Sequence, residues 1–243
     1  MKPEPASAPP VAVLAGGLGT RLAAAVPGRP KILAPVRGRP LLDWLLSDLA
    51  AAGFRRVLLS LGHRADEVIE AAGDGSYWGL AVTCLVEPAP RGTGGALKLA
   101  AEQLREPFVA MNGDGLLQAP WAELMAQTDT PVTILGAQVA DTSDYGALEV
   151  AGPLGRVALR GFVEKGRPGA GWVNAGVYRL RPEVFAEVPA GRAVSLETEV
   201  LPTLLAGGWP IEVLCVPTTR FLDIGTPDRY AAAEGWSPSR EQP

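Results

Sequence analysis

The sequence has little of the chemistry that several large enzyme classes need. It contains one histidine, His63, and no Gly-x-Ser-x-Gly segment, so a hydrolytic triad has little support. Its two cysteines, Cys84 and Cys215, lie inside apolar segments and form no Cys-x-x-Cys pair. That placement argues against a zinc site and favours two buried, reduced thiols, although the sequence leaves a disulfide open.

Long apolar runs and an excess of charge are also missing. No apolar run approaches the ~20 residues that a membrane-spanning helix needs. Residues 1–10 are rich in Pro and Ala and lack the apolar core of a signal peptide. The net charge of −4 excludes a surface built as a whole for nucleic acid or anionic membranes. We therefore expect a cytoplasmic protein with a disordered arm at residues 1–10.

What the chain does have is an alternation of short apolar runs with segments of helical periodicity. The apolar runs predict buried strands, at residues 11–15, 57–61, 81–86 and 108–111. The segments between them predict helices, at residues 41–54, 65–72 and 93–104. Such alternation is typical of an α/β fold, in which helices cover both faces of a mostly parallel sheet. Ligands bind these sheets at the carboxyl ends of the strands.

The pattern changes after about residue 130. Strand-like segments follow one another there with few helices between them, at residues 132–139, 147–150, 156–164 and 172–180. Helical spacing returns near residues 196–205 and 230–235. We expect this second half to continue the sheet and to add a substrate-binding lobe. Residues 11–235 would then form one domain, and residues 236–243 a tail.

The segment with the most chemical information directly follows the first predicted strand. Gly16, Gly17 and Gly19 allow backbone N–H groups to approach phosphates closely. Arg21 and Lys31 then supply cations for phosphate oxygens. The glycines alone fit a structural turn equally well. The joint pattern of glycines, Thr-Arg and a later Pro-Lys is more specific and predicts a phosphate-binding loop.

Two familiar glycine motifs do not fit this segment. A P-loop closes with Gly-Lys-Ser or Gly-Lys-Thr, but here Gly19 is followed by Thr20 and Arg21. A dinucleotide-binding fingerprint needs a third Gly or Ala where Leu22 stands. These differences argue against an ATPase of the P-loop class and against an NAD-dependent oxidoreductase.

A second candidate site is formed by two carboxylates. Asp114 follows the fourth predicted strand in the segment Asn112-Gly113-Asp114, which is also ordinary turn chemistry. Asp223 is far away in the sequence. If the fold brings them together, the pair forms a Mg²⁺ site, because Mg²⁺ is commonly held by one or two carboxylates together with substrate phosphates.

Residues 16–35 resemble the signature of the sugar nucleotidylyltransferases, the family of glucose-1-phosphate thymidylyltransferase and mannose-1-phosphate guanylyltransferase. The resemblance covers residues 11–235, because further segments follow in the family's order. These are Glu87 with residues 91–96, residues 112–114, Glu164-Lys165, residues 174–178, residues 195–197 and residues 221–227. It implies the nucleotide-diphospho-sugar transferase (GT-A-like) fold, a Rossmann-like, mostly parallel but mixed sheet between helices. It also implies a nucleotide-binding half at 11–130 and a sugar-binding half at 131–235.

The resemblance also implies roles for individual residues. Catalytic roles fall to Arg21, Lys31, Asp114 and Lys165, and Mg²⁺ would be the cofactor, held by Asp114 and Asp223. The implied nucleotide-binding residues are Leu14, Ala15, Gly16, Gly17, Gly19, Thr20, Arg21, Glu87, Gly92, Thr93, Asn112 and Gly113. The implied sugar-binding residues are Tyr145, Gly146, Glu164, Lys165, Asn174, Gly176 and Glu197. One departure is Gly115, where relatives usually carry a larger residue, and we expect it to loosen the loop.

The implied partners are an NTP and a sugar 1-phosphate, without nucleic acid or membrane, in a monomer or homodimer. Within the family, residues 14–100 are most similar to the short guanylyltransferases acting on D-glycero-α-D-manno-heptose 1-phosphate, which make GDP-heptose for surface polysaccharides. A carboxylate such as Glu87 at a strand end favours guanine, whose N1 and N2 are both donors. Uridylyl or thymidylyl transfer to N-acetylmuramate or hexose 1-phosphate is the alternative. A non-catalytic nucleotide-sugar sensor is the alternative from another class, and the four retained catalytic and metal-binding candidates argue against it.

Overall fold

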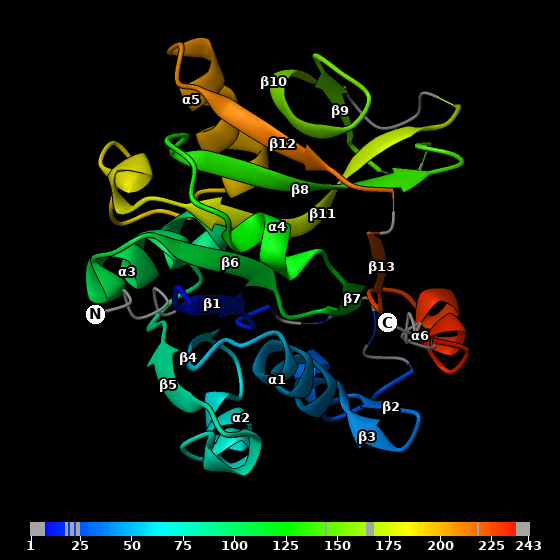
Figure 1. Cartoon of the computed structure of the whole chain (residues 1–243). Helices are drawn as coiled ribbons and strands as arrows, with labels where there is room; N and C mark the ends of the chain where they lie inside the picture. Colours follow the sequence, from blue (N-terminus) through cyan, green and yellow to red (C-terminus); the bar gives the residue numbers. More distant parts are fainter. Residues whose placement is uncertain are drawn as a thin grey trace, which may run out of the picture.

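The computed structural model describes residues 8–17, 19, 22, 25–143, 145–163, 168–217 and 219–236. Within these residues, a nine-stranded sheet runs through the molecule (Figure 1). In sheet order its strands are β5 (Ala81–Val86), β4 (Arg56–Leu61), β1 (Val11–Leu14), β6 (Phe108–Asn112), β11 (Gly171–Leu180), β8 (Val132–Val139), β12 (Ile211–Cys215), β10 (Gly155–Val163) and β9 (Ala147–Val150).

The direction of the strands divides the sheet into two parts. Strands β5, β4, β1 and β6 are mutually parallel, as the alternation of strands and helices predicted. β11 then runs antiparallel to both β6 and β8, β12 is parallel to β8, and β10 and β9 are antiparallel to their neighbours. Because β9 also pairs with β11, the second part of the sheet curls back on itself. The sheet is therefore mixed, which confirms the predicted fold class.

Helices cover both faces of the sheet, and the alternation of side chains along the strands builds two cores. Val11 and Val13 of β1 face a core that includes α1 (Leu41–Ala51), α2 (Ala65–Ala72), α4 (Trp121–Met125) and α6 (Pro227–Ala233). Ala12 faces the second core, with α3 (Gly92–Leu104), η3 (Pro182–Phe185), η4 (Leu196–Val200) and α5 (Leu201–Ala206). Completely apolar strands are expected where both faces of a sheet are buried.

Several short elements were not predicted from the sequence. β7 (Gly115–Gln118) and β13 (Arg220–Asp223) form an antiparallel pair outside the main sheet. β2 (Pro35–Val36) and β3 (Arg39–Pro40) form a small hairpin, and η1 (Lys31–Leu33) and η2 (Ser76–Trp78) are single helical turns. The helix expected near residues 196–205 is a π-helical turn, η4, followed by α5. The helix expected at residues 230–235 begins earlier, at Pro227, where Thr226 caps it.

The packed part of the chain extends past both predicted boundaries. Residues 1–7 and 237–243 lie outside the described residues. Pro10, within the expected arm, is buried, and its carbonyl accepts a hydrogen bond from the N–H of Val109 at 2.9 Å. Trp236, the first residue of the expected tail, is 7% exposed and packs in the core beside α1.

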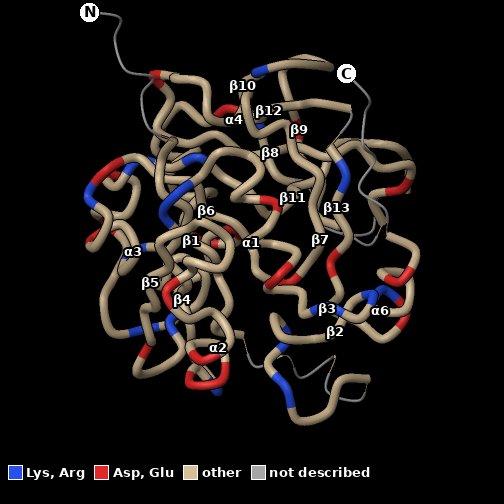
Figure 2. The backbone as a smooth tube through the Cα atoms, turned by 60° about the horizontal axis from the view of Figure 1, so that its bottom comes forward, with Lys and Arg blue, Asp and Glu red and all other residues tan. Residues whose placement is uncertain are grey.

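Other sequence expectations concern charge, cysteine and membranes. Lys and Arg are interspersed with Asp and Glu along the described backbone (Figure 2). Both cysteines are free thiols, and burial raises the pKa of Cys215 to about 11. In the described part of the chain, every helix is too short or too polar to cross a membrane.

A half-buried carboxylate joins α1 to α4 and makes stability depend on pH. Asp48 accepts a hydrogen bond from Nε1 of Trp121 at 3.0 Å. Burial raises the pKa of Asp48 above 3.8, and the Trp121 hydrogen bond offsets this only in part. Between 3.8 and the raised pKa, the native protein therefore binds more protons than the unfolded chain. The stability that Asp48 contributes accordingly falls as the pH rises through that window.

We expect Asp48→Asn to unfold at a higher temperature than the wild type at neutral pH, because its amide oxygen still accepts from Trp121 without a charge to bury. The advantage should shrink as the pH falls through the raised pKa, because the native carboxyl takes up a proton there. Thermal unfolding followed by circular dichroism from about pH 4 to about pH 7.5 tests this. An advantage that is the same across that range contradicts the ionisation as its cause.

Candidate active site

The glycine segment begins where three parallel strands end together. Leu14 is the last residue of β1, and the N–H of Ala15 donates to the carbonyl of Ser60 at the end of β4, at 2.8 Å. On the other side, the N–H of Gly113, just after β6, donates to the carbonyl of Leu14 at 2.8 Å. These bonds hold the start of the loop at the carboxyl edge of the sheet, where ligands of such folds bind.

The glycines in and beside this loop are needed for different structural reasons. A Cβ on Gly62 would lie 2.7 Å from the carbonyl oxygen of Gly16, so Gly62 is required by the close approach of the two backbones. A Cβ on Gly17 would meet no atom of the described residues within 4 Å, so no described neighbour accounts for that glycine. Gly19 has a φ of +61°, which favours glycine, and lies beside Lys31. Thr20 and Arg21 fall outside the described residues.

Glu87 holds the loop that leads into α3. Its Oε1 accepts from the hydroxyl of the fully buried Ser60 at 3.0 Å, and its Oε2 accepts from the N–H of Arg91 at 3.1 Å. Gly92 has a φ of +68°, and a Cβ there would lie 2.4 Å from the carbonyl oxygen of Val194. The predicted base-binding loop is therefore fixed at both ends by the fold. Each Glu87 oxygen retains capacity to accept a further hydrogen bond.

A partly buried polar network connects this loop to the second half of the chain. Thr93 Oγ1 donates to Glu197 Oε2 at 2.7 Å, and the hydroxyl of Tyr178 donates to Glu197 Oε1 at 3.0 Å. Asn174 Nδ2 in turn donates to the Tyr178 hydroxyl at 2.7 Å. Burial and the neighbouring Glu197 raise the pKa of Tyr178 well above its ordinary value, so this hydroxyl keeps its proton. Thus Thr93, predicted to bind nucleotide, and Asn174, predicted to bind sugar, belong to one network.

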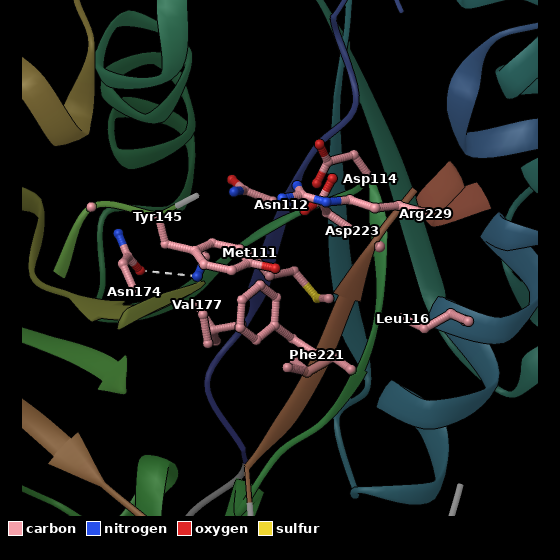
Figure 3. A pocket seen from close by; sticks show the side chains of 15 residues that line it. Met111, Asn112, Asp114, Leu116, Tyr145, Asn174, Val177, Phe221, Asp223 and Arg229 are labelled. Atoms are coloured by element: carbon pink, nitrogen blue, oxygen red, sulfur yellow. Dashed lines mark hydrogen bonds and ion pairs between the residues drawn. The ribbon is translucent and has the colours of Figure 1, made fainter. Parts of the chain in front are cut away.

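The segment after β6 packs against the sugar-side strand. A Cβ on Gly176 would lie 2.6 Å from Nδ2 of Asn112, and Gly176 has a φ of +73°. β11 is irregular here, with a register shift between Asn174 and Tyr178, and the N–H of Gly176 donates to Asn174 Oδ1 at 2.9 Å (Figure 3). The resemblance implied that Gly176 binds sugar. In the structure, the side chain of Asn112 lies against Gly176, which also lines the cavity described next.

Asp114 and Asp223 lie together at a cavity of about 240 Å³ (Figure 3). Asp223 pairs with Gly115 in the β7–β13 ladder, and the N–H of Ile224 donates to the carbonyl of Asp114 at 2.9 Å. A Cβ on Gly115 would lie 2.7 Å from the carbonyl oxygen of Leu222. The sequence suggested that Gly115 loosens this segment, but the structure gives it another role. It permits the close strand contact that brings the two carboxylates side by side.

Each carboxylate has its own cation. Lys31 Nζ donates to Asp114 Oδ2 at 2.9 Å, and the lysine side chain is only 14% exposed. Arg229 NH1 donates to Asp223 Oδ2. Arg229 was not predicted from the sequence, because an arginine inside a short helix is usually a solvated surface residue. Its only sequence signal is its position six residues after Asp223.

The cavity also contains predicted sugar-side residues. Tyr145, Gly146 and Asn174 line it together with the carboxylates. The ring of Tyr145 stands edge-on to Phe221, with centroids 5.6 Å apart, and both residues also line a second cavity of about 390 Å³. Glu164 and Lys165 lie outside the described residues. Glu197 does not line the cavity and contacts it through Tyr178 and Asn174.

The carboxylates at the cavity can hold Mg²⁺ only if a bound ligand supplies further oxygen atoms. Within the described residues, no group of three or more Asp, Glu, His or Cys side chains is placed to hold a metal. Two neighbouring carboxylates remain, Asp114 and Asp223, both partly exposed to the cavity. Mg²⁺ is commonly bound by one or two carboxylates, with water and substrate phosphates completing its octahedron. The pair therefore fits a Mg²⁺ that arrives with a phosphate ligand.

Comparison with known proteins places these features in a family. Residues 11–235 match the nucleotidyl transferase family. The chain belongs to that family. This confirms the resemblance read from the glycine segment and from the motifs that follow it.

Individual relatives differ in how much of their length is matched. The chain is 35% identical to mannose-1-phosphate guanylyltransferase of Mycobacterium tuberculosis, over 90% of this chain but 61% of that protein. It is 27% identical to D-glycero-alpha-D-manno-heptose 1-phosphate guanylyltransferase of Campylobacter jejuni, over 90% of this chain and 95% of that protein. The solved structure of HddC from Yersinia pseudotuberculosis complexed with GMP-PN superposes with a TM-score of 0.81 at 31% identity, covering 93% and 98% of the two chains.

Gly17 and Gly62 separate a ligand-binding role from a structural one. Gly17→Ala adds a methyl group where no atom of the described residues lies within 4 Å, so we expect the free energy of unfolding of this variant to change by less than about 0.5 kcal/mol. If phosphates approach the backbone at this residue, the dissociation constant of the Gly17→Ala variant for GTP should rise roughly tenfold or more above that of the wild type. Gly62→Ala should instead lose about 1–3 kcal/mol of stability through the contact with Gly16.

Denaturant unfolding and calorimetric titration with GTP measure the two effects separately. A Gly17→Ala protein that binds GTP as tightly as the wild type would show that the loop does not approach the phosphates at this residue. The Gly62→Ala protein serves as the control for damage that reaches the loop through the fold.

Proposed function

We propose that this protein transfers a guanylyl group from GTP to a sugar 1-phosphate, forming a nucleotide sugar and releasing pyrophosphate. The observation that carries the proposal is the cavity in which Asp114 and Asp223 lie together with Tyr145 and Asn174. The glycine loop begins at the carboxyl edge of the same sheet, and its neighbour Lys31 contacts Asp114. Family membership supports the reaction class.

The reaction needs no nucleophile from the protein. An oxygen of the sugar phosphate attacks the α-phosphorus of GTP, and the bond from that phosphorus to the bridging oxygen of pyrophosphate breaks. Catalysis then consists of positioning the two phosphates and neutralising the charge on them. Mg²⁺, when held by Asp114 and Asp223, would supply neutralising positive charge at the phosphate oxygens.

The residues of this chain would supply the rest. Lys31, held at Asp114, adds a cation on the side of the glycine loop. The loop itself offers backbone N–H groups to the triphosphate, and Asn174 and Tyr145 contact the sugar. Arg21 and Lys165 keep the catalytic roles proposed from the resemblance. The nucleotide-binding half at residues 11–130 and the sugar-binding half at 131–235 remain part of the proposal.

For the sugar we propose D-glycero-α-D-manno-heptose 1-phosphate. Similarity to the Campylobacter jejuni heptose 1-phosphate guanylyltransferase extends over nearly the whole of that protein. Mannose 1-phosphate is the second candidate, supported by the higher identity to the mannose-1-phosphate guanylyltransferases. The chain spans 61% of the Mycobacterium tuberculosis protein and 55% of the Yarrowia lipolytica one. Both candidates share the manno configuration.

Guanine as the base is supported by two observations. The HddC structure was solved with GMP-PN, and the Mycobacterium tuberculosis and Yarrowia lipolytica relatives, 35% and 34% identical, are guanylyltransferases by name. Glu87, at the end of β5, has both oxygens fixed by Ser60 and Arg91 and keeps lone pairs for the N1–H and N2–H₂ of guanine. A uridylyl- or thymidylyltransferase remains the alternative.

A pyrophosphate-release screen tests base and sugar together. We expect GTP with heptose 1-phosphate to give the highest kcat/KM among GTP, ATP, UTP and dTTP combined with heptose, mannose, glucose and N-acetylmuramate 1-phosphates. A site whose polar groups are left unpaired rejects a wrong ligand by roughly 10⁴ or more. The highest value with UTP or dTTP would overturn the guanylyl assignment, and absence of turnover with every pair would favour a non-catalytic sensor.

The two carboxylates are tested by charge removal at constant shape. Asp114→Asn and Asp223→Asn should each lower kcat by roughly 10²–10³ or more, because each removes a charge that would hold Mg²⁺. Titration calorimetry with Mg²⁺ in the presence of GTP should show weaker metal binding in both variants. Near-normal turnover in both, with the fold intact by circular dichroism, would refute the metal site.

A further inference from the structure

Arg229 reaches the cavity from α6, and its backbone position is fixed. Thr226 caps this helix, with its hydroxyl accepting from the N–H of Arg229 at 3.4 Å. The side chain lines the same cavity as Asp114, Asp223 and Asn174, and it is 28% exposed. Figure 3 shows it extending toward the two carboxylates. Arg229 is thus a cavity residue, although it lies on a surface helix.

Two contacts hold the guanidinium in place. NH1 donates to Asp223 Oδ2, and the Cζ atom lies 5.1 Å from the centroid of the Tyr145 ring. A guanidinium carries five N–H donors in one plane, so a single hydrogen bond to Asp223 leaves donors that match a phosphate. The cation–π contact with the ring restrains the guanidinium and reduces the entropy lost when an anion binds.

The two cations that contact the carboxylate pair have different neighbours, and of the two only Arg229 lines the cavity. Lys31 joins Asp114 to the glycine loop, since a Cβ on Gly19 would lie 3.6 Å from Lys31 Cβ. Arg229 joins Asp223 to Tyr145, which was predicted to contact sugar. An anion close to Arg229 is therefore on the sugar side of the carboxylate pair. In the proposed reaction, that anion is the phosphate of the sugar substrate.

We propose that Arg229 binds the phosphate of the sugar 1-phosphate while its NH1 remains on Asp223. The inference rests on the proposed function and adds a substrate-binding residue from α6. It assigns the guanidinium to one substrate only, because the triphosphate lies on the side of Lys31 and the glycine loop. Arg229 therefore governs affinity for the sugar phosphate and leaves affinity for the nucleotide unchanged.

The test compares Arg229→Gln and Arg229→Lys with a matched control, Arg39→Gln. Arg39 makes the same two kinds of contact, with Nε 2.7 Å from Asp43 Oδ2 and Cζ 4.5 Å from the Trp44 ring centroid, but it lies outside the cavity. Calorimetric titrations with heptose 1-phosphate, mannose 1-phosphate and free mannose, each in the presence of Mg²⁺, measure the contribution of the phosphate. Titration with GTP measures the nucleotide side, and thermal unfolding checks the fold.

Arg229→Gln should weaken binding of the sugar 1-phosphate roughly ten- to hundredfold, the usual effect of losing hydrogen bonds from a charged group. Its dissociation constant for GTP should stay within about threefold. The affinity of Arg229→Lys for the sugar 1-phosphate should lie between those of the wild type and Arg229→Gln, because lysine keeps the charge and loses the planar fork. Arg39→Gln should change neither affinity.

Other outcomes overturn the inference in distinguishable ways. If Arg229→Gln weakens Mg²⁺ binding and leaves sugar-phosphate binding unchanged, Arg229 only orients Asp223. If it weakens GTP as much as the sugar phosphate, the assignment to one substrate is wrong. If the wild type binds neither sugar 1-phosphate, the proposed function itself fails, whereas wild-type binding that Arg229→Gln does not alter refutes the role of Arg229 alone.

Discussion

The close contact between β7 and β13 is the constraint on which the rest of the site depends. These two strands form a separate small sheet outside the main one, and Gly115 is the residue that lets their backbones approach. Because Asp223 pairs with Gly115, a segment more than 100 residues away is brought beside Asp114. α6 follows directly and carries Arg229 to the same cavity. Without the β7–β13 pair, the main sheet would still present the glycine loop and Asp114, but Asp223 would not lie beside them.

A second connection joins the two halves through hydrogen bonds. Thr93 and Tyr178 both donate to Glu197, and Asn174 donates to Tyr178. All of these bonds are 2.7–3.0 Å long, and the Tyr178 side chain is completely buried. Buried polar groups that satisfy one another fix a single arrangement, since breaking one bond leaves another group unpaired. The network therefore sets the distance between the loop predicted to read the base and the strand predicted to hold the sugar.

Much of this could be predicted from the sequence, because the parallel half obeys local rules. The apolar runs that became β1, β4 and β6 are buried on both faces and, like the periodic segments between the strands, need no long-range information. The run that became β5 was also expected to be a buried strand, but β5 is an edge strand whose side chains are half-buried or exposed. The short pair β7–β13 could not be predicted in this way, since its strands have four residues each and are specified by their contact. Gly62 and Arg229 were missed for the same reason: their roles come from neighbours distant in sequence. The motif resemblance named most site residues but not the contacts that hold them.

The charges of the cavity explain why metal and phosphates should bind together. Asp114 is neutralised by Lys31 and Asp223 by Arg229, so this set of four side chains has no net charge. A phosphate arriving alone meets cations already engaged with carboxylates, and a divalent cation arriving alone competes with them. With both ligands present, Asp114 and Asp223 would hold Mg²⁺, and Lys31 and Arg229 would turn their remaining donors to phosphate oxygens. Within the proposed reaction, the ion pairs thus act as a preorganised set of partners in which each ligand favours the binding of the other.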